Sequence, residues 1–411
     1  MSNYKILFCL RALKSIVDSF VDTFLVLYFL DVSSENIIPL GIYQLILVLT
    51  VYLTIYCCRN LAKSKHRIML LRVGIVLDLV YFLSIILLKD RIVDYAYLVG
   101  ALRGLEEGFY YSVYNTIESD GVSNKERTRY IGNYSLVKST LSVIFPIVFG
   151  GMIYATGFVE STTVVLVVVA LRMVLSFVFK DKNIPRVKKS NMGKVRQITR
   201  GDKRFMYLCI SRFFDGLTSS ASMFPNIVTI YFITVFSNSI SLGIFTAAAS
   251  VVNGAMGVLF AKFLKKKHYN GMMGISSALT VVALVMMVLD CNVVTIIAFR
   301  FLRAISKNAV HLVNEANVCN LCNDPKIKRE HKMEYWILVE RSLVYGRIAS
   351  CILFIMMAFM DSWIPIMMLF AVCLGLFASS AIQFNNAMDR HSRRRQVSRE
   401  LAPAYETVTK K

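Results

Sequence analysis

The chain has 411 residues, of which 56% are apolar, and it carries a formal net charge of +21. The apolar share exceeds the roughly 45–50% that is usual for soluble globular proteins, and the surplus lies in continuous blocks about as long as a membrane-spanning helix. These features exclude an ordinary soluble domain, and continuous blocks are unlike the short alternating segments of an outer-membrane barrel.

The apolar blocks predict an all-α polytopic membrane protein, because a helix satisfies its own backbone inside lipid. We expect the first block to remain as a span, since the N-terminus lacks the features of a cleavable signal peptide. Twelve transmembrane helices are predicted, at 6–30, 38–58, 68–88, 95–117, 130–155, 162–179, 205–235, 242–261, 270–289, 293–317, 334–360 and 366–384.

The positive charge is distributed unevenly between the two sides of the predicted membrane. Lys and Arg gather before the first span, in the even-numbered loops and in the tail HSRRRQVSR (391–399), whereas the odd-numbered loops contain only Lys89 and Arg91. Cytoplasmic loops carry such an excess, so we expect both termini in the cytoplasm. The tail is then expected to lie against anionic lipid headgroups, and nucleic acid is not a predicted partner.

The longest hydrophilic stretch inside the chain divides it nearly in half. It predicts an N-terminal six-helix bundle (1–179), a basic cytoplasmic linker (180–204), a C-terminal six-helix bundle (205–384) and a basic tail (385–411). The halves match at an offset near 200 residues: Gly41 with Gly243, Gly74 with Gly274, Arg103 with Arg303, and LVKSTLSVI (136–144) with LVERSLVYG (338–346). These matches predict two parallel repeats with a substrate site at their interface.

This arrangement resembles the major facilitator superfamily of transporters over essentially the whole chain. Two stretches lie where the superfamily has local motifs. RNLAKSKHR (59–67) replaces G-x-x-x-D-R-x-G-R-R without its glycine and aspartate, and FPIVFGG (145–151) differs from the G-P-x-x-G-G of drug antiporters by one extra residue and by lacking the first glycine. The resemblance implies two six-helix bundles that rock about a central site.

Ionisable residues inside the predicted spans concentrate on spans one, four, seven and ten. They are Arg11, Lys14, Asp18 and Asp22; Arg103, Glu106 and Glu107; Arg212 and Asp215; and Arg300, Arg303, Lys307 and Glu315, while span eleven adds Glu340, Arg341 and Arg347. A charge that faces lipid at mid-bilayer costs about 3 kcal/mol, so we expect these side chains to face a polar interior. The resemblance implies the same helices, since the first helix of each triplet lines the superfamily's central cavity.

Helical spacing places the charges of each span on one face. Steps of three and four residues connect Arg103, Glu107, Tyr110 and Tyr114 within RGLEEGFYYSVYN (103–115), and residues so spaced are neighbours on a helix. We expect this stripe to form one wall of a substrate pathway, because tyrosine offers both a ring for stacking and a hydroxyl for hydrogen bonds.

The signs of the charges predict two roles. Asp18, Asp22, Glu106 and Glu107 are candidates for proton coupling, with Asp22 and Glu107 preferred, because repulsion between carboxylates in a poorly hydrated site favours protonation of one of them. The candidates for substrate binding are Arg103, Tyr110, Tyr114, Asp215, Arg303, Lys307 and Arg347. The basic members would suit an anionic substrate.

A purely structural interpretation stays open for each of these charges. Lys14 with Asp18, Arg103 with Glu107, and Arg212 with Asp215 could be pairs within one helix. For Arg72, Asp78, Lys138 and Arg172 the structural interpretation is the preferred one.

The predicted function is a secondary active transporter that moves a small polar or anionic solute across a bacterial cytoplasmic membrane, coupled to protons and acting as a monomer. An efflux antiporter for drugs or toxic compounds is an alternative, and a non-transporting sensor or lipid-handling protein is an alternative of another class. No Walker A loop or nucleophile–base arrangement is found, so an enzyme is not predicted. The cysteines include one isolated pair, Cys319 and Cys322 in CNLC, which lacks the second pair of a zinc site, so no metal or cofactor is expected.

Overall fold

The computed structural model describes residues 3–62, 64, 66–121, 124–179, 191–218, 222–236, 239–263, 268–290, 292–322, 327 and 331–408. Within these helices, the side chains at 3–4, 115–121, 124–133, 135, 234–236, 261–263, 307–309, 311–312, 315–316, 319–320, 333 and 392–408 lie outside the description. The described part of the chain is helical and contains no β-strand, as the sequence predicts.

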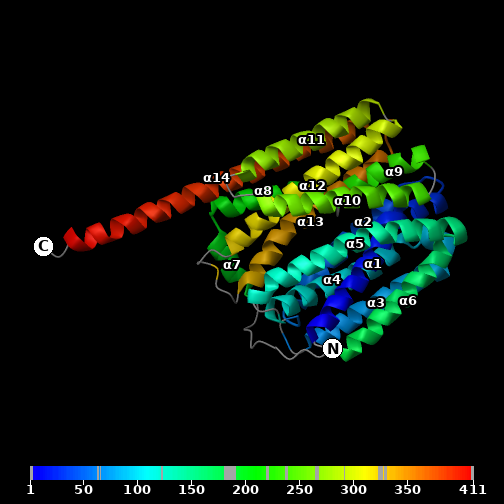
Figure 1. The fold of residues 1–411 in the computed structure, drawn as a ribbon, viewed down its shortest axis with the longest axis horizontal. Helices are drawn as coiled ribbons and strands as arrows, with labels where there is room; N and C mark the ends of the chain where they lie inside the picture. Colours follow the sequence, from blue (N-terminus) through cyan, green and yellow to red (C-terminus); the bar gives the residue numbers. More distant parts are fainter. Residues whose placement is uncertain are drawn as a thin grey trace.

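Helices from the two halves of the chain gather in two groups (Figure 1). The first group comprises α1 (Asn3–Val32), α2 (Ile38–Cys58), α3 (Arg67–Leu88), the 3-10 helix η1 (Lys89–Val93), α4 (Ala96–Gly121), α5 (Asn124–Thr156) and α6 (Phe158–Val178). After the short α7 (Met192–Thr199), the second group comprises α8 (Lys203–Thr218), α9 (Phe224–Phe236), α10 (Ser239–Phe263), α11 (Tyr269–Leu289), α12 (Val293–Cys322), α13 (Lys332–Met357) and α14 (Ile364–Val408).

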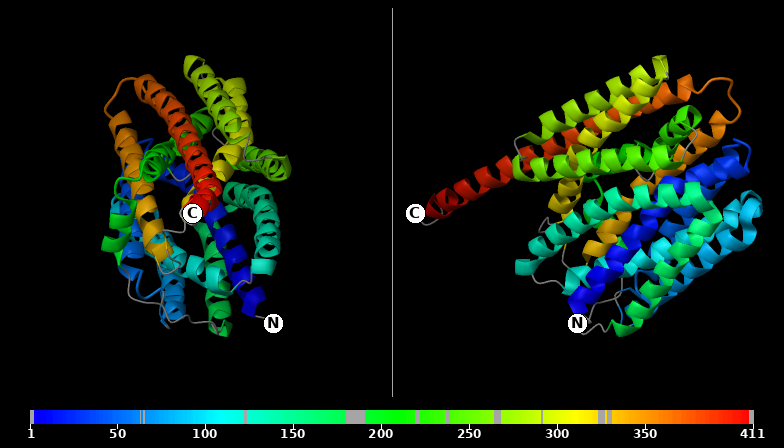
Figure 2. Two further views of the ribbon diagram at one scale, coloured as in Figure 1. Left: turned by 90° about the vertical axis from the view of Figure 1, so that its left-hand side faces the viewer. Right: turned by 45° about the vertical axis from the view of Figure 1, so that its right-hand side comes forward.

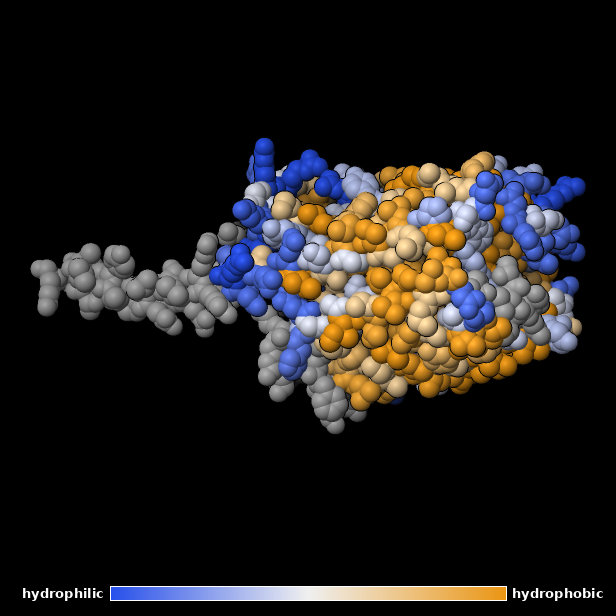
Figure 3. All heavy atoms as spheres, turned by 90° about the horizontal axis from the view of Figure 1, so that it is seen from above, coloured by the Kyte–Doolittle hydropathy of each residue, from blue (hydrophilic) through white to orange (hydrophobic). Residues whose placement is uncertain are grey.

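The outer surface of the bundle is that of a membrane protein. Seven of the described helices, α2, α3, α5, α6, α10, α11 and α14, are long and apolar enough to cross a membrane. The helices α1, α4, α12 and α13 are not among them, because they carry the clustered ionisable residues. Figure 3 shows an apolar belt between two polar ends. Leu87, Leu289 and Phe359 are among the most exposed of the described apolar side chains. The chain is a multi-pass membrane protein, and the number of twelve spans stays a prediction.

The predicted seventh span is not one helix. Within 205–235, α8 ends at Thr218 and α9 begins at Phe224. Residues 219–221 between them lie outside the described part of the chain. Pro225 lies in the first turn of α9, where a proline is tolerated because it has no N–H to donate. At the start of α9 the backbone N–H of Met223 donates to Ser350 Oγ, at 3.0 Å. The serines before Pro225 are a helix-start signal that apolar length alone concealed.

The last helix is longer than the predicted span 366–384. Helix α14 continues to Val408, and its end projects beyond the bundle (Figure 2). The basic tail therefore continues the twelfth predicted span as a helix.

The helix groups meet where α2 packs on α13 and α5 on α10, and α1 also contacts α9 and α10. Gly41 and Gly243, matched by the repeat, lie at the first two of these contacts. A Cβ added to Gly41 on α2 would meet Ile355 Cγ1 of α13 at 2.5 Å, and one added to Gly243 on α10 would overlap the carbonyl oxygen of Pro146 on α5. Next to this contact, Ser239 Oγ donates to the carbonyl oxygen of Gly150 at 3.2 Å. The tight contacts at Gly41 and Gly243 lie near the starts of α2 and α10, away from the end of the bundle that holds the N-terminus (Figure 1). Farther along, α10 remains beside α5, where a Cβ added to Gly254 would lie 3.7 Å from Ser139.

Candidate functional site

Helix α4 is held close to α2 by glycines at every fourth position. A Cβ at Gly104 would lie 2.7 Å from the carbonyl oxygen of Leu47, and one at Gly100 would overlap the carbonyl oxygen of Tyr43. Small residues at this spacing let two membrane helices approach backbone to backbone. The approach fixes the position of the charged turn of α4 that contains Arg103, Glu106 and Glu107.

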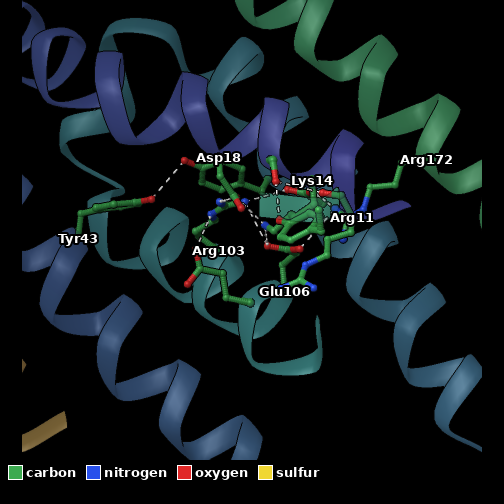
Figure 4. Close-up of polar contacts among 12 residues, drawn as sticks. Arg11, Lys14, Asp18, Tyr43, Arg103, Glu106 and Arg172 are labelled. Carbon is green, nitrogen blue, oxygen red and sulfur yellow. Dashed lines mark hydrogen bonds and ion pairs between the residues drawn. The ribbon is translucent and has the colours of Figure 1, made fainter. Parts of the chain in front are cut away.

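Arg103 is the centre of a buried cluster of charges (Figure 4). Its Nη2 lies 2.6 Å from Asp18 Oδ1 of α1, and its Nη1 lies 3.1 Å from both Asp78 Oδ1 of α3 and Glu106 Oε2. Its Nε lies 3.2 Å from Glu107 Oε1. One guanidinium therefore contacts four carboxylates, which come from three helices.

Two further cations complete this N-terminal charge cluster. Lys14 Nζ lies 2.6 Å from Glu106 Oε2 and 3.0 Å from Asp18 Oδ1. Arg172 of α6 has its Nη1 2.7 Å from Asp78 Oδ2 and 3.5 Å from Glu106 Oε1. The cluster thus joins Lys14, Arg103 and Arg172 to four carboxylates, and near balance of charge is what makes so many ionised groups tolerable away from water.

The cluster brings together several residues for which a functional and a structural interpretation were both open. Lys14 pairs with Asp18 and Arg103 with Glu107 within one helix, as the structural interpretation expected, but both pairs also reach other helices. Asp78 and Arg172, not chosen as site residues, are central to the cluster. The sequence offers one indication of this pairing. Asp78 and Arg172 have opposite charges, and each lies in an otherwise apolar stretch.

The predicted tyrosine wall faces the interior of the N-terminal helices. Tyr110 and Tyr114 are buried and stacked, with ring centroids 5.2 Å apart. Arg172 and Lys14 lie 5.2 and 5.7 Å from the centre of the Tyr110 ring, and Arg11 Nη1 donates to the Tyr114 hydroxyl at 3.2 Å. This placement favours a role in holding cations over direct contact with a solute, whereas the neighbouring Tyr111 is exposed.

The proton-coupling candidates differ in exposure. Glu106 is fully buried, whereas Asp18 and Glu107 are 29% and 21% exposed. Asp22 is exposed, and no ion pair or hydrogen bond joins it to a described side chain. Among the four proton-coupling candidates, Asp22, Asp18 and Glu107 are therefore the ones whose side chains are at least partly exposed.

The charges of the second half form smaller groups. Asp215 Oδ2 accepts from Arg212 Nη1 at 3.0 Å and from Asn314 Nδ2 at 2.6 Å, which confirms the expected pair within α8. Arg347 Nη1 lies 3.9 Å from Glu340 Oε1. The predicted residue Lys307 has its side chain outside the described part of the chain.

Arg303 has different surroundings from Arg103, its counterpart in the repeat. Its Nη2 donates to the carbonyl oxygen of Thr218, at the last residue of α8, at 3.1 Å. Its guanidinium carbon lies 4.4 Å from the centre of the Phe224 ring. Among the described residues, no carboxylate forms an ion pair with it.

Comparison with known proteins gives relatives of unknown function and a clear fold. No family model matches the chain. It is 24% identical over 328 residues to YqgE, an uncharacterized protein of Bacillus subtilis, covering 79% of this chain and 75% of that protein. It is 28% identical over 165 residues to an uncharacterized protein in the sodM 3′ region of Geobacillus stearothermophilus, covering 40% of this chain and 77% of that protein.

Two solved structures share the fold along nearly the whole chain. One is a bacterial homologue of the iron transporter ferroportin in an inward-facing state, with a TM-score of 0.66 and 13% identity, covering 93% of this chain and 98% of that one. The other is a bacterial homologue of the human lysosomal transporter Spinster, inward-facing and unoccupied, with the same TM-score and identity, covering 94% and 98%. Both are transporters of the major facilitator superfamily, so the resemblance inferred from the sequence is confirmed for the fold.

Proposed function

We propose that this chain is a secondary transporter that moves a small polar or anionic solute across the membrane by alternating access between its two helix groups. The observation that carries the proposal is the partial exposure of charged side chains midway along α1 and α4, where a purely structural helix would be apolar. Exposed Asp22 and partly exposed Asp18 and Glu107 supply polar groups that a solute or proton can reach.

The packing between the helix groups supports one conformational state. The contacts at Gly41 and Gly243 close the end of the bundle opposite the N-terminus. If the termini are cytoplasmic, as the distribution of basic residues predicts, the closed end is the outer one and the structure is inward-facing. Both similar solved structures are inward-facing as well.

Proton coupling is the mode of energy supply that the carboxylates favour. Asp22 is the preferred proton carrier, because it is exposed and no described side chain forms an ion pair with it. Glu107 and Asp18 are second candidates, since their protonation would weaken the pairing of Arg103 and so change the N-terminal charge cluster.

A disulfide lock tests the proposal directly. A cysteine sulfur at the position of Ile355 Cγ1 would lie near a Cβ at residue 41, close to the geometry of a disulfide. The double variant Gly41→Cys/Ile355→Cys, with the native cysteines replaced, is expected to form the bond and to hold the outer end closed.

The measurement is solute exchange by proteoliposomes loaded with defined carboxylates, phosphates, sugars, amino acids and lipophilic cations, followed by mass spectrometry with and without a pH difference. We expect flux of one class in the reduced double variant, loss of flux on oxidation, and no effect of oxidation on either single-cysteine variant. Flux confined to lipophilic cations would support the efflux antiporter instead. If no class moves in the reduced protein, the non-transporting alternative is favoured.

A further inference from the structure

Arg300 and Arg303 lie one turn apart on α12, and neither pairs with an acid in the described part of the chain. Arg300 donates through Nη1 to Thr246 Oγ1 and through Nη2 to Thr229 Oγ1, both at 3.3 Å. Arg303 reaches only the carbonyl oxygen of Thr218, and its other terminal nitrogen, Nη1, is buried without a hydrogen-bond partner. As whole residues, Arg300 and Arg303 are partly buried.

The repeat shows that the second half keeps the arginine and loses its acids. Arg103 contacts four carboxylates, and Arg303 is its counterpart at an offset of 200 residues. At the same offset the positions of Asp18, Asp78, Glu106 and Glu107 hold Thr218, Ala278, Ser306 and Lys307. One spatial relation is shared by the two halves, because Arg303 reaches residue 218 as Arg103 reaches residue 18. The contact of Arg303 is with the backbone carbonyl of Thr218, whereas that of Arg103 is with the carboxylate of Asp18.

Aromatic rings lie beside both guanidinium groups. Arg300 lies 4.6 Å from the centre of the Phe232 ring, and Arg303 lies 4.4 Å from Phe224 and 5.9 Å from Phe299. Such contacts orient a guanidinium and offset part of its desolvation cost, but they supply no negative charge. Two positive charges one helical turn apart also repel each other. An anion between them would offset this repulsion and attract both guanidinium groups, so it would be bound strongly.

Glu315 is the first acid after Arg303 on α12, and its side chain lies outside the described part of the chain. It follows Arg303 by twelve residues, which corresponds to about 18 Å along a helix. No described acid therefore supplies a counter-charge to Arg300 or Arg303.

We infer that Arg300 and Arg303 bind the anionic group, a carboxylate or a phosphate, of the solute that this protein carries. The inference rests on the proposed function and narrows it to solutes with such a group. Arginine is suited to the task because its planar fork of donors matches both kinds of oxyanion. In the N-terminal charge cluster, each of the three described cations, Lys14, Arg103 and Arg172, already contacts a carboxylate.

Arg72 provides a matched control within the same chain. Its Nη2 donates to the carbonyl oxygen of Ser176 at 3.4 Å, and its guanidinium lies 4.9 Å from the Phe177 ring. These contacts resemble those of Arg303, but Arg72 lies in the second turn of α3, near the end of the bundle. Replacing Arg72 should leave anion binding unchanged.

Thermal unfolding and titration calorimetry of the purified full-length protein test the inference. The probes are sodium phosphate and sodium benzoate, compared with sodium chloride and benzyltrimethylammonium chloride at equal ionic strength. Phosphate or benzoate is expected to raise the unfolding temperature saturably in the native protein and in Arg72→Gln. In Arg300→Gln and Arg303→Gln the dissociation constant should rise by roughly tenfold or more, with Arg303→Lys in between.

A structural role for the arginines predicts the reverse pattern. If Arg300→Gln unfolds at a lower temperature in chloride while its affinity for the probes is unchanged, the arginine serves the fold and the inference is overturned. Equal affinity in all variants overturns it as well. A lipid source is tested by repeating the titration in phosphatidylcholine nanodiscs with and without phosphatidylglycerol. Stabilisation that requires phosphatidylglycerol and ignores the soluble anions would assign the arginines to a lipid headgroup.

The binding assay tests the anion site and the exchange assay tests the transport function, so a negative result in one can be told apart from a negative result in the other. Arginine-dependent anion binding without any exchange would leave the site intact and reject the transport function. Exchange that is unaffected by Arg300→Gln and Arg303→Gln would leave the transport function intact and reject the anion site.

Discussion

Asp78 shows how a single residue can decide the stability of a membrane bundle. Its two carboxylate oxygens face different guanidinium groups, Arg103 on one side and Arg172 on the other. All three side chains are buried, so no water can replace a lost partner. Removal of one member of a buried ion pair costs more than replacement of the whole pair, because the remaining charge is left uncompensated.

We predict that Asp78→Asn lowers the free energy of unfolding by roughly 3–5 kcal/mol, measured by thermal and denaturant unfolding in detergent. Asp90→Asn, a change of an exposed aspartate in η1, is the matched control and should have little effect. Adding Arg172→Gln to Asp78→Asn should restore part of the loss. If the double variant were less stable than Asp78→Asn alone, balance of charge would not be what holds the cluster.

Asp22 and Asp18 lie one turn apart on α1, and we predict different effects of their replacement on the free energy of unfolding. Asp18 contacts Lys14 and Arg103, so Asp18→Asn should destabilise the fold. Asp22→Asn should change the free energy of unfolding by no more than about 0.5 kcal/mol, as for other exposed sites. In proteoliposomes Asp22→Asn should abolish the dependence of exchange on a pH difference, and an unchanged pH response would remove Asp22 as the proton carrier.

At the scale of helices, close packing of α4 on α2 depends on the absence of side chains. A Cβ added to Gly100, Gly104 or Gly108 would overlap the backbone or a side chain of α2. Since α4 carries the acids around Arg103, its distance from α2 also controls the geometry of the N-terminal charge cluster.

We predict that Gly100→Ala lowers the free energy of unfolding by about 1–3 kcal/mol, because the added methyl group overlaps the carbonyl oxygen of Tyr43. Gly274→Ala on α11, where nothing lies within 4 Å of an added Cβ, should be neutral or stabilise the protein by up to about 1 kcal/mol. Thermal unfolding of both variants measures the difference. Equal behaviour of the two would show that α2 and α4 have more space than the structure gives them.

At the scale of the whole molecule, the two helix groups meet where residues lack bulk. On α10, Gly243 lies directly against the backbone of α5, while Gly254 of the same helix has only the side chain of Ser139 nearby, at 3.7 Å. A larger side chain at residue 243 would therefore disfavour the conformation in which the outer end is closed. A larger side chain at residue 254 would not.

We predict that Gly243→Val shifts the population toward an outward-open form, whereas Gly254→Val does not. Spin labels at Leu87 and Leu289, exposed at the ends of α3 and α11, should move apart at the outer side. Labels at Met69 and His268, at the opposite ends of these helices, should approach each other. Double electron–electron resonance in a background without native cysteines measures both distances, and unchanged distances in Gly243→Val would contradict rocking about these interfaces.

Much of this architecture is encoded locally and could be predicted from the sequence. Apolar length identifies the helices, and the repeat identifies Gly41 and Gly243 as equivalent before their contacts are known. The three pairs that the structural interpretation named depend only on spacing within one helix: Lys14–Asp18, Arg103–Glu107 and Arg212–Asp215. The break between α8 and α9 departs from the predicted single span. The serines and Pro225 at the start of α9 also favour a helix start, so this break too has a local signal in the sequence.

By itself the sequence determined that this is a multi-pass helical membrane protein whose charges lie on particular helices, because hydrophobic length and helical periodicity are properties of neighbouring residues. Only the tertiary structure decided which charges neutralise one another. Asp78 and Arg172 are separated by 94 residues, and whether they meet depends on how α3 and α6 are rotated and packed. The same packing buries Tyr110, exposes Asp22 and places no described acid beside Arg303, because each outcome depends on what the neighbouring helices present to it.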